Sequence, residues 1–307
     1  MENLDYSIVV PVFNSELTLE ELYERLQKEF TQMAVTWEVI FVDDGSADDS
    51  WKVLKNIKES DPSHVKAIRL SKNFGQHNAT FCGFSFARGK FVLTIDDDLQ
   101  IPPEEIKKLI SLQKEEDADI VYGTYKKKQH GYARNMGSKY ARKSSGHILG
   151  RSNPETSFRL IDRQIIEEVL EHHQYFVYID ELLSWYTENI SFALVEHRKR
   201  ETSKSGYNVR KFWQLVSNVI IYYTNIPLRF MVYGGLITSL FFVVLIVYFV
   251  FAKIFFNVPV LGYTSLITAI LFSTSLIMFC LGVIGEYLRR IYMVQNKKPP
   301  FSIKKIL

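Results

Sequence analysis

The sequence of 307 residues predicts an α/β domain with a mainly parallel sheet, followed by two transmembrane helices. Three observations lead to this prediction. Short apolar runs alternate with helical patterns over the first 125 residues, acidic residues follow two of those runs, and two long segments near the carboxyl end carry no charge. Strands that alternate with helices of ordinary length form parallel sheets with helices on both faces.

The predicted elements of the α/β domain follow one another in a regular order. Apolar, buried-type runs predict strands at Tyr6–Phe13, Glu38–Val42, Val65–Leu70, Lys90–Ile95 and Ile120–Gly123. Helical periodicity predicts helices at Leu17–Gln32, Asp48–Glu59 and His77–Ala87. Pro102-Pro103 opens a further helix, because proline is favoured at the first helical turn.

The tripeptide Asp96-Asp97-Asp98 is the most informative motif, because it ends an apolar strand in carboxylates. In an extended segment, residues i and i+2 point the same way, so Asp96 and Asp98 are expected to converge. Two converging carboxylates fit a hard divalent cation whose shell is completed by substrate phosphates. Taken alone, the motif fits a solvated acidic turn before Pro102-Pro103 equally well.

A second acidic motif, Asp43-Asp44-Gly45-Ser46, follows the strand expected at 38–42. Ligands of parallel sheets bind beyond the carboxyl ends of the strands, where both acidic motifs are expected. For Asp43 and Asp44, the alternative is an N-terminal cap of the helix after Gly45. The sequence contains no G-x-G-x-x-G and no P-loop, so it supports neither a dinucleotide fold nor a P-loop phosphate cradle.

Residues Met231–Phe251 and Leu261–Gly285 are predicted to span a membrane, because each segment is apolar and free of charge. A helix of about 20 residues crosses a hydrocarbon core of roughly 30 Å. A buried helix of a soluble protein is the alternative. Basic residues flank the pair of spans on their outer sides, so the positive-inside rule places both termini in the cytoplasm. These residues are Arg210, Lys211, Arg229, Arg289, Arg290, Lys297, Lys298, Lys304 and Lys305.

Composition restricts the class and the compartment of the protein further. The net charge of only +3 argues against a general nucleic-acid binder. No signal peptide is predicted, because residues 1–5 are polar and residues 6–13 are too short for its apolar core. Cys82 and Cys280 fall in different regions, so no disulfide framework is expected and a reducing compartment fits.

Seven segments occur in an order that resembles the membrane-bound family 2 glycosyltransferases, which make polyprenyl-phosphate sugars. They are VVPVFNSE (9–16), FVDDGSADDS (41–50), NFGQHNAT (73–80), DDDLQIPPEEI (96–106), SFRLIDR (157–163), IPLR (226–229) and GVIGEYLRRIY (282–292). The chain looks closest to the branch that transfers formamido-arabinose to undecaprenyl phosphate. Dolichyl-phosphate mannose synthases and the glucosyl-carrier synthases of O-antigen modification are similar but more distant.

The resemblance implies a GT-A-type catalytic domain and a division of the whole chain. The catalytic domain is expected over 1–205 and a juxtamembrane amphipathic segment over 206–230. The two transmembrane helices are expected over 231–290, and a cytoplasmic basic tail over 291–307.

The resemblance also implies a nucleotide-sugar site built from these motifs. Pro11 and Phe13 match positions that line the pocket of the base, and Asp43 and Asp44 match positions that bond the base and ribose. A carboxylate accepts well from an imide N–H and from ribose hydroxyls. The full set expected to bind the nucleotide sugar is Pro11, Phe13, Asp43, Asp44, Asp96, Asp97 and Lys126.

A divalent metal ion, Mg²⁺ or Mn²⁺, is implied beside that site. Asp98 is the main expected ligand, assisted by Asp96 and Gln100. The ion would act as a Lewis acid that offsets the charge developing on the departing nucleoside diphosphate.

The implied acceptor is a lipid monophosphate, which is already anionic near neutral pH. Some relatives have Gly-Asp where this chain has Thr156 and Ser157, so the obvious general base is absent. Either Asp97 or Asp98 assists, or no base is needed, which we favour. The cations expected to bind the acceptor phosphate are Arg159, Arg198, Arg200 and Lys204.

Arg159 and Arg200 match the family's most recognisable basic positions, and arginine pairs with phosphate in a bidentate way. The resemblance therefore implies that Arg159 and Arg200 join Asp98 as catalytic residues. For the basic residues near the membrane, simple attraction to anionic lipid is the alternative.

The implied reaction transfers a single sugar from a nucleotide-sugar donor to a polyprenyl phosphate, with inversion at the anomeric carbon. A UDP-sugar is favoured over a GDP-sugar, and undecaprenyl phosphate is the favoured acceptor. The enzyme is expected in the inner, cytoplasmic membrane, in cell-envelope glycan synthesis or modification, and relatives assemble as homotetramers. One alternative is a processive polysaccharide synthase, which usually carries Q-x-x-R-W and more spans. Another is a membrane scaffold that keeps the fold without turnover.

Overall fold

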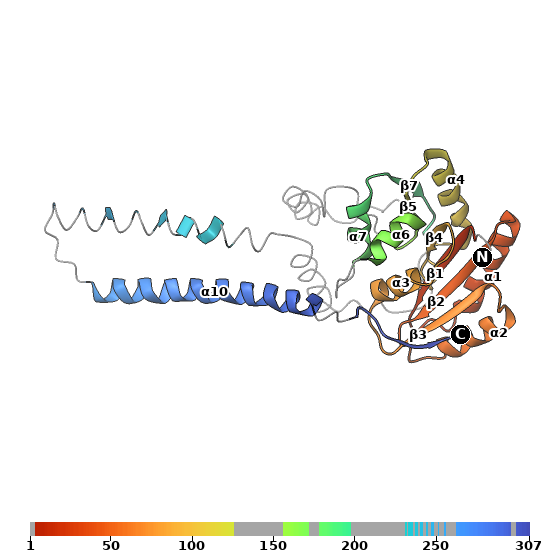
Figure 1. The fold of residues 1–307 in the computed structure, drawn as a ribbon, viewed down its shortest axis with the longest axis horizontal. Coiled ribbons are helices and arrows are strands. Elements are labelled where there is room, and N and C mark those ends of the chain that lie inside the picture. The colour runs from red at the N-terminus through yellow and green to blue at the C-terminus, as the bar shows by residue number, and fades with distance from the viewer. Residues whose placement is uncertain are drawn as a thin grey trace. The chain divides into compact units, whose positions relative to one another are not determined.

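The computed structural model describes residues 4–125, 156–171, 178–197, 262–295 and 299–307, together with single positions between 231 and 255 (Figure 1). The chain divides into two compact units. The first comprises Met1–Gly206 with Pro299–Leu307, and the second comprises Tyr207–Lys298. The first unit contains the α/β domain, and the second contains both predicted spans.

The first unit is built on a sheet whose described strands follow the order β7-β5-β6-β4-β1-β2-β3-β8. They are β1 (Tyr6–Val12), β2 (Trp37–Asp43), β3 (Val65–Leu70), β4 (Phe91–Thr94), β5 (Ile120–Thr124), β6 (Arg159–Asp162), β7 (Ile190–Leu194) and β8 (Ile303–Ile306). Neighbours among β4, β1, β2 and β3 pair in parallel, as do β5 and β7. Only the pairs that involve β6 or β8 are antiparallel within the described sheet. The predicted α/β fold with a mainly parallel sheet is confirmed.

The described helices of this unit follow the predicted order. They are α1 (Leu19–Met33), α2 (Ser50–Ser60), α3 (Gln76–Phe84), α4 (Ile106–Glu116), α6 (Arg163–Leu170) and α7 (Ile179–Tyr186). The expected proline-initiated helix is present, because a short 3-10 turn over Pro103–Glu105 leads directly into α4. Sequence periodicity therefore located the helices between the parallel strands.

Both faces of the central strands are covered, which explains why β1 and β2 are buried along their whole length. On one face, Ile8 packs in a cluster with Leu26 and Phe30 of α1. On the other face, α3 lies so close to β1 that a Cβ added to Gly83 would be 2.3 Å from Cγ1 of Val9. A side chain at position 83 would push the helix away from the sheet, because packed interiors leave no such space.

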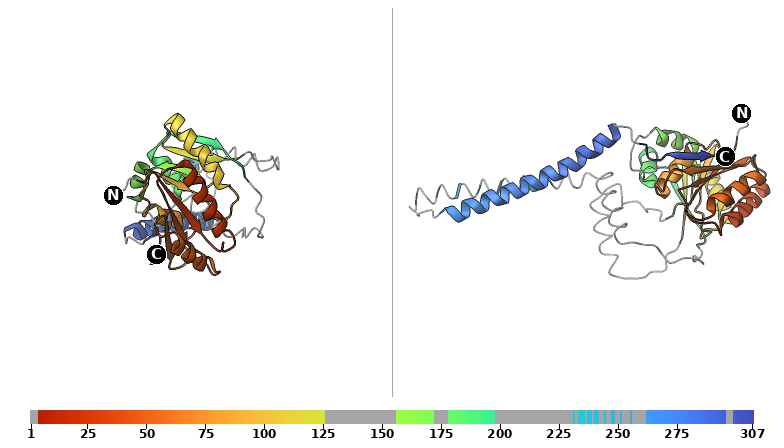
Figure 2. Two further views of the ribbon diagram at one scale, coloured as in Figure 1. Left: turned by 90° about the vertical axis from the view of Figure 1, so that its right-hand side faces the viewer. Right: turned by 90° about the horizontal axis from the view of Figure 1, so that it is seen from below.

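Three strands have no counterpart in the sequence prediction: β6, β7 and β8. The last of these lies in the segment 291–307 that was expected to be a basic tail. This expectation is corrected by the pairing of β8 with β3 at the edge of the sheet, which Figure 1 shows next to the label C. The right-hand view of Figure 2 shows the same dark blue strand ending at the label C. The charges of Lys304 and Lys305 led to the prediction of a tail, although lysine is also common on edge strands.

The second unit contains α10 (Tyr263–Gln295), which includes the second predicted span from Tyr263 onward. Within the described residues, Phe272–Arg289 is the one stretch of helix long and apolar enough to cross a membrane. Large apolar side chains such as Phe272, Met278 and Leu288 are more than half exposed. Of the first predicted span, 231–251, the described positions are helical, and the other positions lie outside the described residues.

Candidate active site

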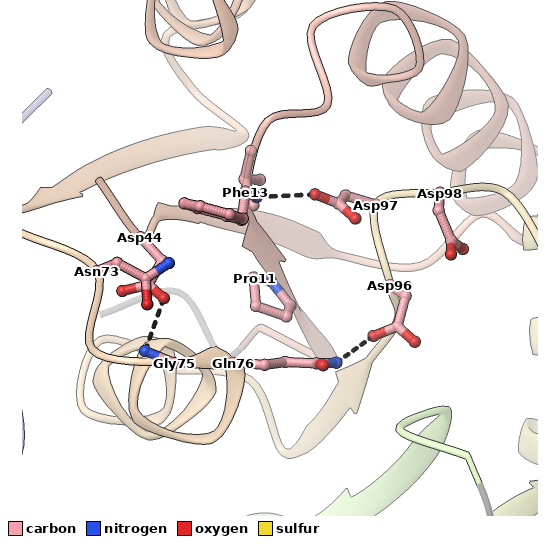
Figure 3. A pocket seen from close by; sticks show the side chains of 10 residues that line it. Pro11, Phe13, Asp44, Asn73, Gly75, Gln76, Asp96, Asp97 and Asp98 are labelled. Carbon is pink, nitrogen blue, oxygen red and sulfur yellow. Dashed lines mark hydrogen bonds between the residues drawn. The ribbon is translucent and has the colours of Figure 1, made fainter. Parts of the chain in front are cut away.

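A pocket of about 260 Å³ opens at the carboxyl ends of β1, β2 and β4, where the two acidic motifs were expected to meet. This volume is close to the lower end of the range for ligand pockets, which is roughly 300–1,000 Å³. The pocket is lined by Pro11, Val12, Phe13, Asp44, Asn73, Gly75, Gln76, Asp96, Asp97 and Asp98 (Figure 3). Six of these residues were expected from the sequence to bind the donor or the metal.

Phe13 stands at the end of β1 with 46% of its surface exposed. An exposed aromatic ring beside a pocket offers a flat apolar surface on which a planar ligand group stacks. Its backbone N–H donates to Oδ2 of Asp97 at 2.9 Å. The loop after β4 therefore determines where the Phe13 backbone lies.

Asp97 forms hydrogen bonds with neighbouring segments of the protein. Its Oδ2 accepts from the Phe13 N–H and from Oγ of Ser15, the latter at 2.5 Å, while its backbone carbonyl accepts from Thr18 Oγ1 at 2.5 Å. Burial raises the pKa of Asp97 to about 6, although the bonds from Ser15 and Phe13 oppose the rise. The two donors to this carboxylate are neutral, and the neighbouring charges of Asp96 and Asp98 add to the rise in its pKa. Asp97 thus ties the loop after β4 to the segment between β1 and α1.

The side chains of Asp96 and Asp98, on either side of Asp97, point away from Phe13, one of the partners of Asp97 (Figure 3). Oδ1 of Asp96 accepts from Nε2 of Gln76 at 2.6 Å, and Oδ1 of Asp98 accepts from the Gln100 N–H at 3.1 Å. The segment is not extended as expected, because the chain turns at residues 97–98. The left-handed conformation of Leu99, with φ of 57°, continues this turn.

Asp44 holds the opposite wall of the pocket. Its two carboxylate oxygens accept from the N–H groups of Phe74, at 2.7 Å, and Gly75, at 2.8 Å. Burial raises its pKa to about 6, against the effect of these two hydrogen bonds. Gly45 follows with φ of 73°, and an added Cβ would lie 2.8 Å from the backbone of Lys72. Only glycine permits this close approach of the two loops.

Asp43 lies behind the pocket and does not line it. Its side chain is fully buried, its Oδ1 accepts from the Ser46 N–H at 2.9 Å, and its Oδ2 lies 3.0 Å from Nε of Arg69. This ion pair lacks the alignment of a hydrogen bond, so it is an electrostatic contact. The alternative of a cap for the following helix is wrong, because α2 begins at Ser50, beyond the turn that Asp43 closes.

Arg159 is almost completely buried, with 2% of its surface exposed, at the start of β6. Its Nη1 donates to Oδ1 of Asp180, in the first turn of α7, at 2.6 Å, and its guanidinium lies over the Tyr122 ring at 5.9 Å. His77 follows Gln76 in α3, and its ring lies 4.8 Å from that of Tyr178. Burial lowers the pKa of His77 to about 4, so its imidazole is neutral near pH 7.

Residues 7–182 match the family described as Glycosyl transferase family 2. The chain belongs to this family. Among curated relatives, the undecaprenyl-phosphate 4-deoxy-4-formamido-L-arabinose transferase of Proteus mirabilis is 33% identical, over 98% of this chain and 93% of the relative. An uncharacterized glycosyltransferase of Synechocystis sp. is 32% identical, over 98% of this chain and 95% of the relative. The family and these relatives make the protein a glycosyltransferase.

A solved structure with a similar fold is that of S. aureus TarS 1–349 in complex with UDP-GlcNAc. The TM-score is 0.49 and the sequence identity is 21%, over 72% of this chain and 68% of that chain.

The glycosyltransferase fold brings together only part of the expected set. Pro11, Phe13, Asp44 and the residues 96–98 share one pocket, whereas Asp43, Gln100 and Arg159 do not line it. Four expected residues lie outside the described part of the chain: Lys126, Arg198, Arg200 and Lys204.

Sequence reasoning missed four residues around this glycosyltransferase site: Asn73, Gly75, Gln76 and Asp180. The first three belong to the NFGQH segment, which was quoted for the resemblance but received no role. Asp180 had no signal beyond an acidic residue in a helical first turn, which usually reflects the helix dipole alone.

The residues of the pocket fit a divalent metal ion in part. No group of three His, Cys, Asp or Glu side chains within the described ranges forms a complete protein cage. Magnesium-type sites often use one or two carboxylates and take their other ligands from water and substrate phosphates. Asp96 and Asp98 supply hard oxygen ligands of this kind at the pocket wall.

Proposed function

We propose that this glycosyltransferase transfers one sugar from a nucleotide-sugar donor to a polyprenyl phosphate, with undecaprenyl phosphate as the favoured acceptor. The observation that carries the proposal is the match to the Proteus mirabilis transferase over 98% of this chain. Such coverage extends beyond the catalytic domain into the apolar carboxyl-terminal part. The product is a polyprenyl-phosphate sugar for cell-envelope glycans, formed by a single displacement that inverts the anomeric carbon.

The pocket at the ends of β1, β2 and β4 would bind the nucleotide part of the donor. Phe13 offers an exposed ring to the base, and the carboxylates of Asp44 and Asp96 are acceptors for base and ribose donors. A UDP-sugar is the favoured donor and a GDP-sugar the alternative. Asp97 would position Phe13 and the loop that carries Asp98.

Mg²⁺ or Mn²⁺ would bind at Asp98 and Asp96, near Gln100. When bound, the ion supplies positive charge beside the leaving diphosphate. The protein's own part is to hold the two carboxylates in place, through the bonds from Gln76 to Asp96 and from Gln100 to Asp98.

The acceptor phosphate carries its own negative charge, so the proposed reaction needs no strong base. Arg198, Arg200 and Lys204 are the cations proposed to bind it, with Lys126 near the donor. Arg159 is buried and already paired with Asp180, which leaves its guanidinium little access to a phosphate. We therefore propose that Arg159 positions the edge of the site around β6 and α7.

Two transmembrane helices, over 231–290, are proposed to hold the catalytic domain, 1–205, at the cytoplasmic face of the inner membrane. The segment 206–230 would lie at the interface, and both termini would be cytoplasmic. The support is the exposed apolar surface of described residues in both spans, such as Ile237, Leu240 and Ile277. Exposed apolar side chains around a helix are stable in lipid and not in water. A homotetramer is the proposed assembly.

The reaction is tested with the full chain in detergent, undecaprenyl phosphate and Mg²⁺ or Mn²⁺. Labelled nucleotide sugars are supplied singly, with and without EDTA, and the label that enters the organic phase is counted. A lipid monosaccharide that EDTA suppresses supports the proposal. A polymer would instead indicate a processive synthase, and nucleotide binding without product from any donor would indicate a scaffold.

Acceptor binding is tested separately with Arg200→Ala. The substitution is expected to raise the KM for undecaprenyl phosphate about tenfold, because an arginine–phosphate pair is lost. The KM for the donor should stay unchanged. Equal changes in both constants would contradict the assignment of Arg200 to the acceptor.

A further inference from the structure

The last residues of the chain join the catalytic sheet at its edge, next to β3. β8 pairs antiparallel with β3, and Ala67 and Leu307 exchange two backbone hydrogen bonds, at 3.3 and 2.9 Å. At the other end of the pairing, the Ser71 N–H donates to the Ser302 carbonyl at 2.8 Å. Ser71 is the first residue after β3, so this bond holds the start of the segment that follows.

That segment, residues 71–75, forms one wall of the pocket, and we call it the donor loop. Asn73 and Gly75 line the pocket, and Gln76, which begins α3, lines it as well and bonds to Asp96. Asp44 holds the middle of the donor loop through the N–H groups of Phe74 and Gly75. The loop thus carries one side of the donor site without a regular structure of its own.

The helix that follows the donor loop, α3, contacts the same carboxyl-terminal segment. The ring of Phe301 packs edge-on against Phe81 of α3, with a distance of 6.4 Å between ring centres. Phe81 is buried between the helix and its neighbours, so this contact holds the helix into which the loop runs. Residue 302 therefore bonds to the start of the donor loop and residue 301 packs on the helix that follows it, whereas Asp44 holds the middle of the loop.

We propose that the carboxyl-terminal segment, residues 301–307, positions the donor loop and thereby sets the affinity of the pocket for the donor. The inference rests on the proposed function for the identity of the ligand, but not for the coupling between segment and loop. Removing an edge strand leaves β1 and β2 covered on both faces, so the effect is local. The segment lies far from the pocket in sequence and acts only through the donor loop.

The chain offers a matched control inside the same strand. Leu70 pairs with Ile303 and Arg69 pairs with Lys305, so Lys304 is an extra residue opposite this point of β3. Its side chain is exposed. Lys304→Ala therefore changes the segment without removing a contact to the donor loop. Phe301→Tyr keeps an aromatic ring against Phe81 and serves as the conservative variant.

The experiment compares the full chain in detergent with Phe301→Ala, Phe301→Tyr, Lys304→Ala and a chain that ends at Pro300. Hydrogen exchange of the Phe74 and Gly75 amides reports on the donor loop, and calorimetry with UDP reports on the pocket. Phe301→Ala should speed exchange of these two amides and weaken UDP binding about three- to tenfold, the usual range for one aromatic pair. The shortened chain should show a larger change, while Phe301→Tyr and Lys304→Ala should match the unchanged protein.

Two results would overturn the inference. One is unchanged exchange at Phe74 and Gly75 in Phe301→Ala and in the shortened chain. The other is faster exchange spread equally over β1 and β2, which would mean a general loss of stability. If the shortened chain fails to fold, Phe301→Ala decides. If UDP does not bind the unchanged protein, the proposed donor is wrong, and the exchange of the two amides still tests the coupling.

Discussion

The two acidic loops of the pocket, after β2 and after β4, give their carboxylates different partners. After β2, Asp43 is buried beside the guanidinium of Arg69, and Asp44 faces the pocket. After β4, Asp97 is held only by neutral donors, and burial raises its pKa to about 6. Asp43, Asp44 and Asp97 hold segments of the protein together, whereas Asp98 is presented to the pocket with one bond from a neighbouring N–H. Adjacent aspartates with the same sequence signature thus have different tasks, set by the partners that the fold supplies.

Asp98, the carboxylate presented to the pocket, gives the most severe test of the comparison between the two loops. Asp98→Asn should lower turnover by about 1,000-fold or more, because a Lewis-acid contact of several kcal/mol is lost. The thermal unfolding midpoint should stay within a few degrees, since the described contact of Asp98 is one bond from a neighbouring N–H. Sugar transfer to undecaprenyl phosphate measures the effect. Asp117→Asn, at an exposed helix end, is the control, and normal activity of Asp98→Asn would remove the metal assignment.

Arg69→Met should leave the loop after β2 with a carboxylate that has no cationic partner, as in the loop after β4. The substitution leaves Asp43 buried without a cation, which is expected to lower the free energy of unfolding by about 3 kcal/mol. Adding Asp43→Asn should recover much of this loss, because the uncompensated charge disappears. Chemical denaturation of the full chain in detergent measures both variants. Equal stability of the single and the double variant would show that the ion pair contributes nothing beyond packing.

Ser15→Ala removes one of the neutral donors of Asp97. The loss of a hydrogen bond to a charged group should cost about 1.5–3 kcal/mol of unfolding free energy, and should loosen the backbone of Phe13. The affinity for UDP should fall as well, because Phe13 is held less firmly. Ser111→Ala, on the exposed face of α4, is the matched control. Unchanged stability and UDP affinity would mean that Asp97 is held by its backbone contacts alone.

The smallest expected effect is the pH dependence caused by Asp44. Because its pKa is about 6 in the folded protein and lower in the unfolded chain, the folded state binds the extra proton between about pH 4 and pH 6. This group therefore lowers stability as the pH rises through that window, and has a constant effect above it. The thermal midpoint of Asp44→Asn should fall less over this window than that of the unchanged protein. Parallel curves would contradict the raised pKa.

Much of the pocket could be predicted because it is built from strand ends. Asp44 and Asp96 were expected at one edge of the sheet, since a parallel sheet places the carboxyl ends of its strands together. The direction of the side chains was not predictable, because the turn at 97–98 replaced an extended segment. The pairing of Arg159 with Asp180 was also missed, because nothing local in either segment indicates a partner.

The sequence by itself determined the elements whose signal is local. Alternating apolar runs and helical periodicity specified the parallel core, and carboxylates at strand ends marked the site. Only the tertiary structure decided which carboxylate is buried, that Arg159 has a counter-ion, and that residues 303–306 join the sheet next to β3. The physical reason is that periodicity reports burial along one segment, whereas these features depend on contacts between segments that are distant in the chain.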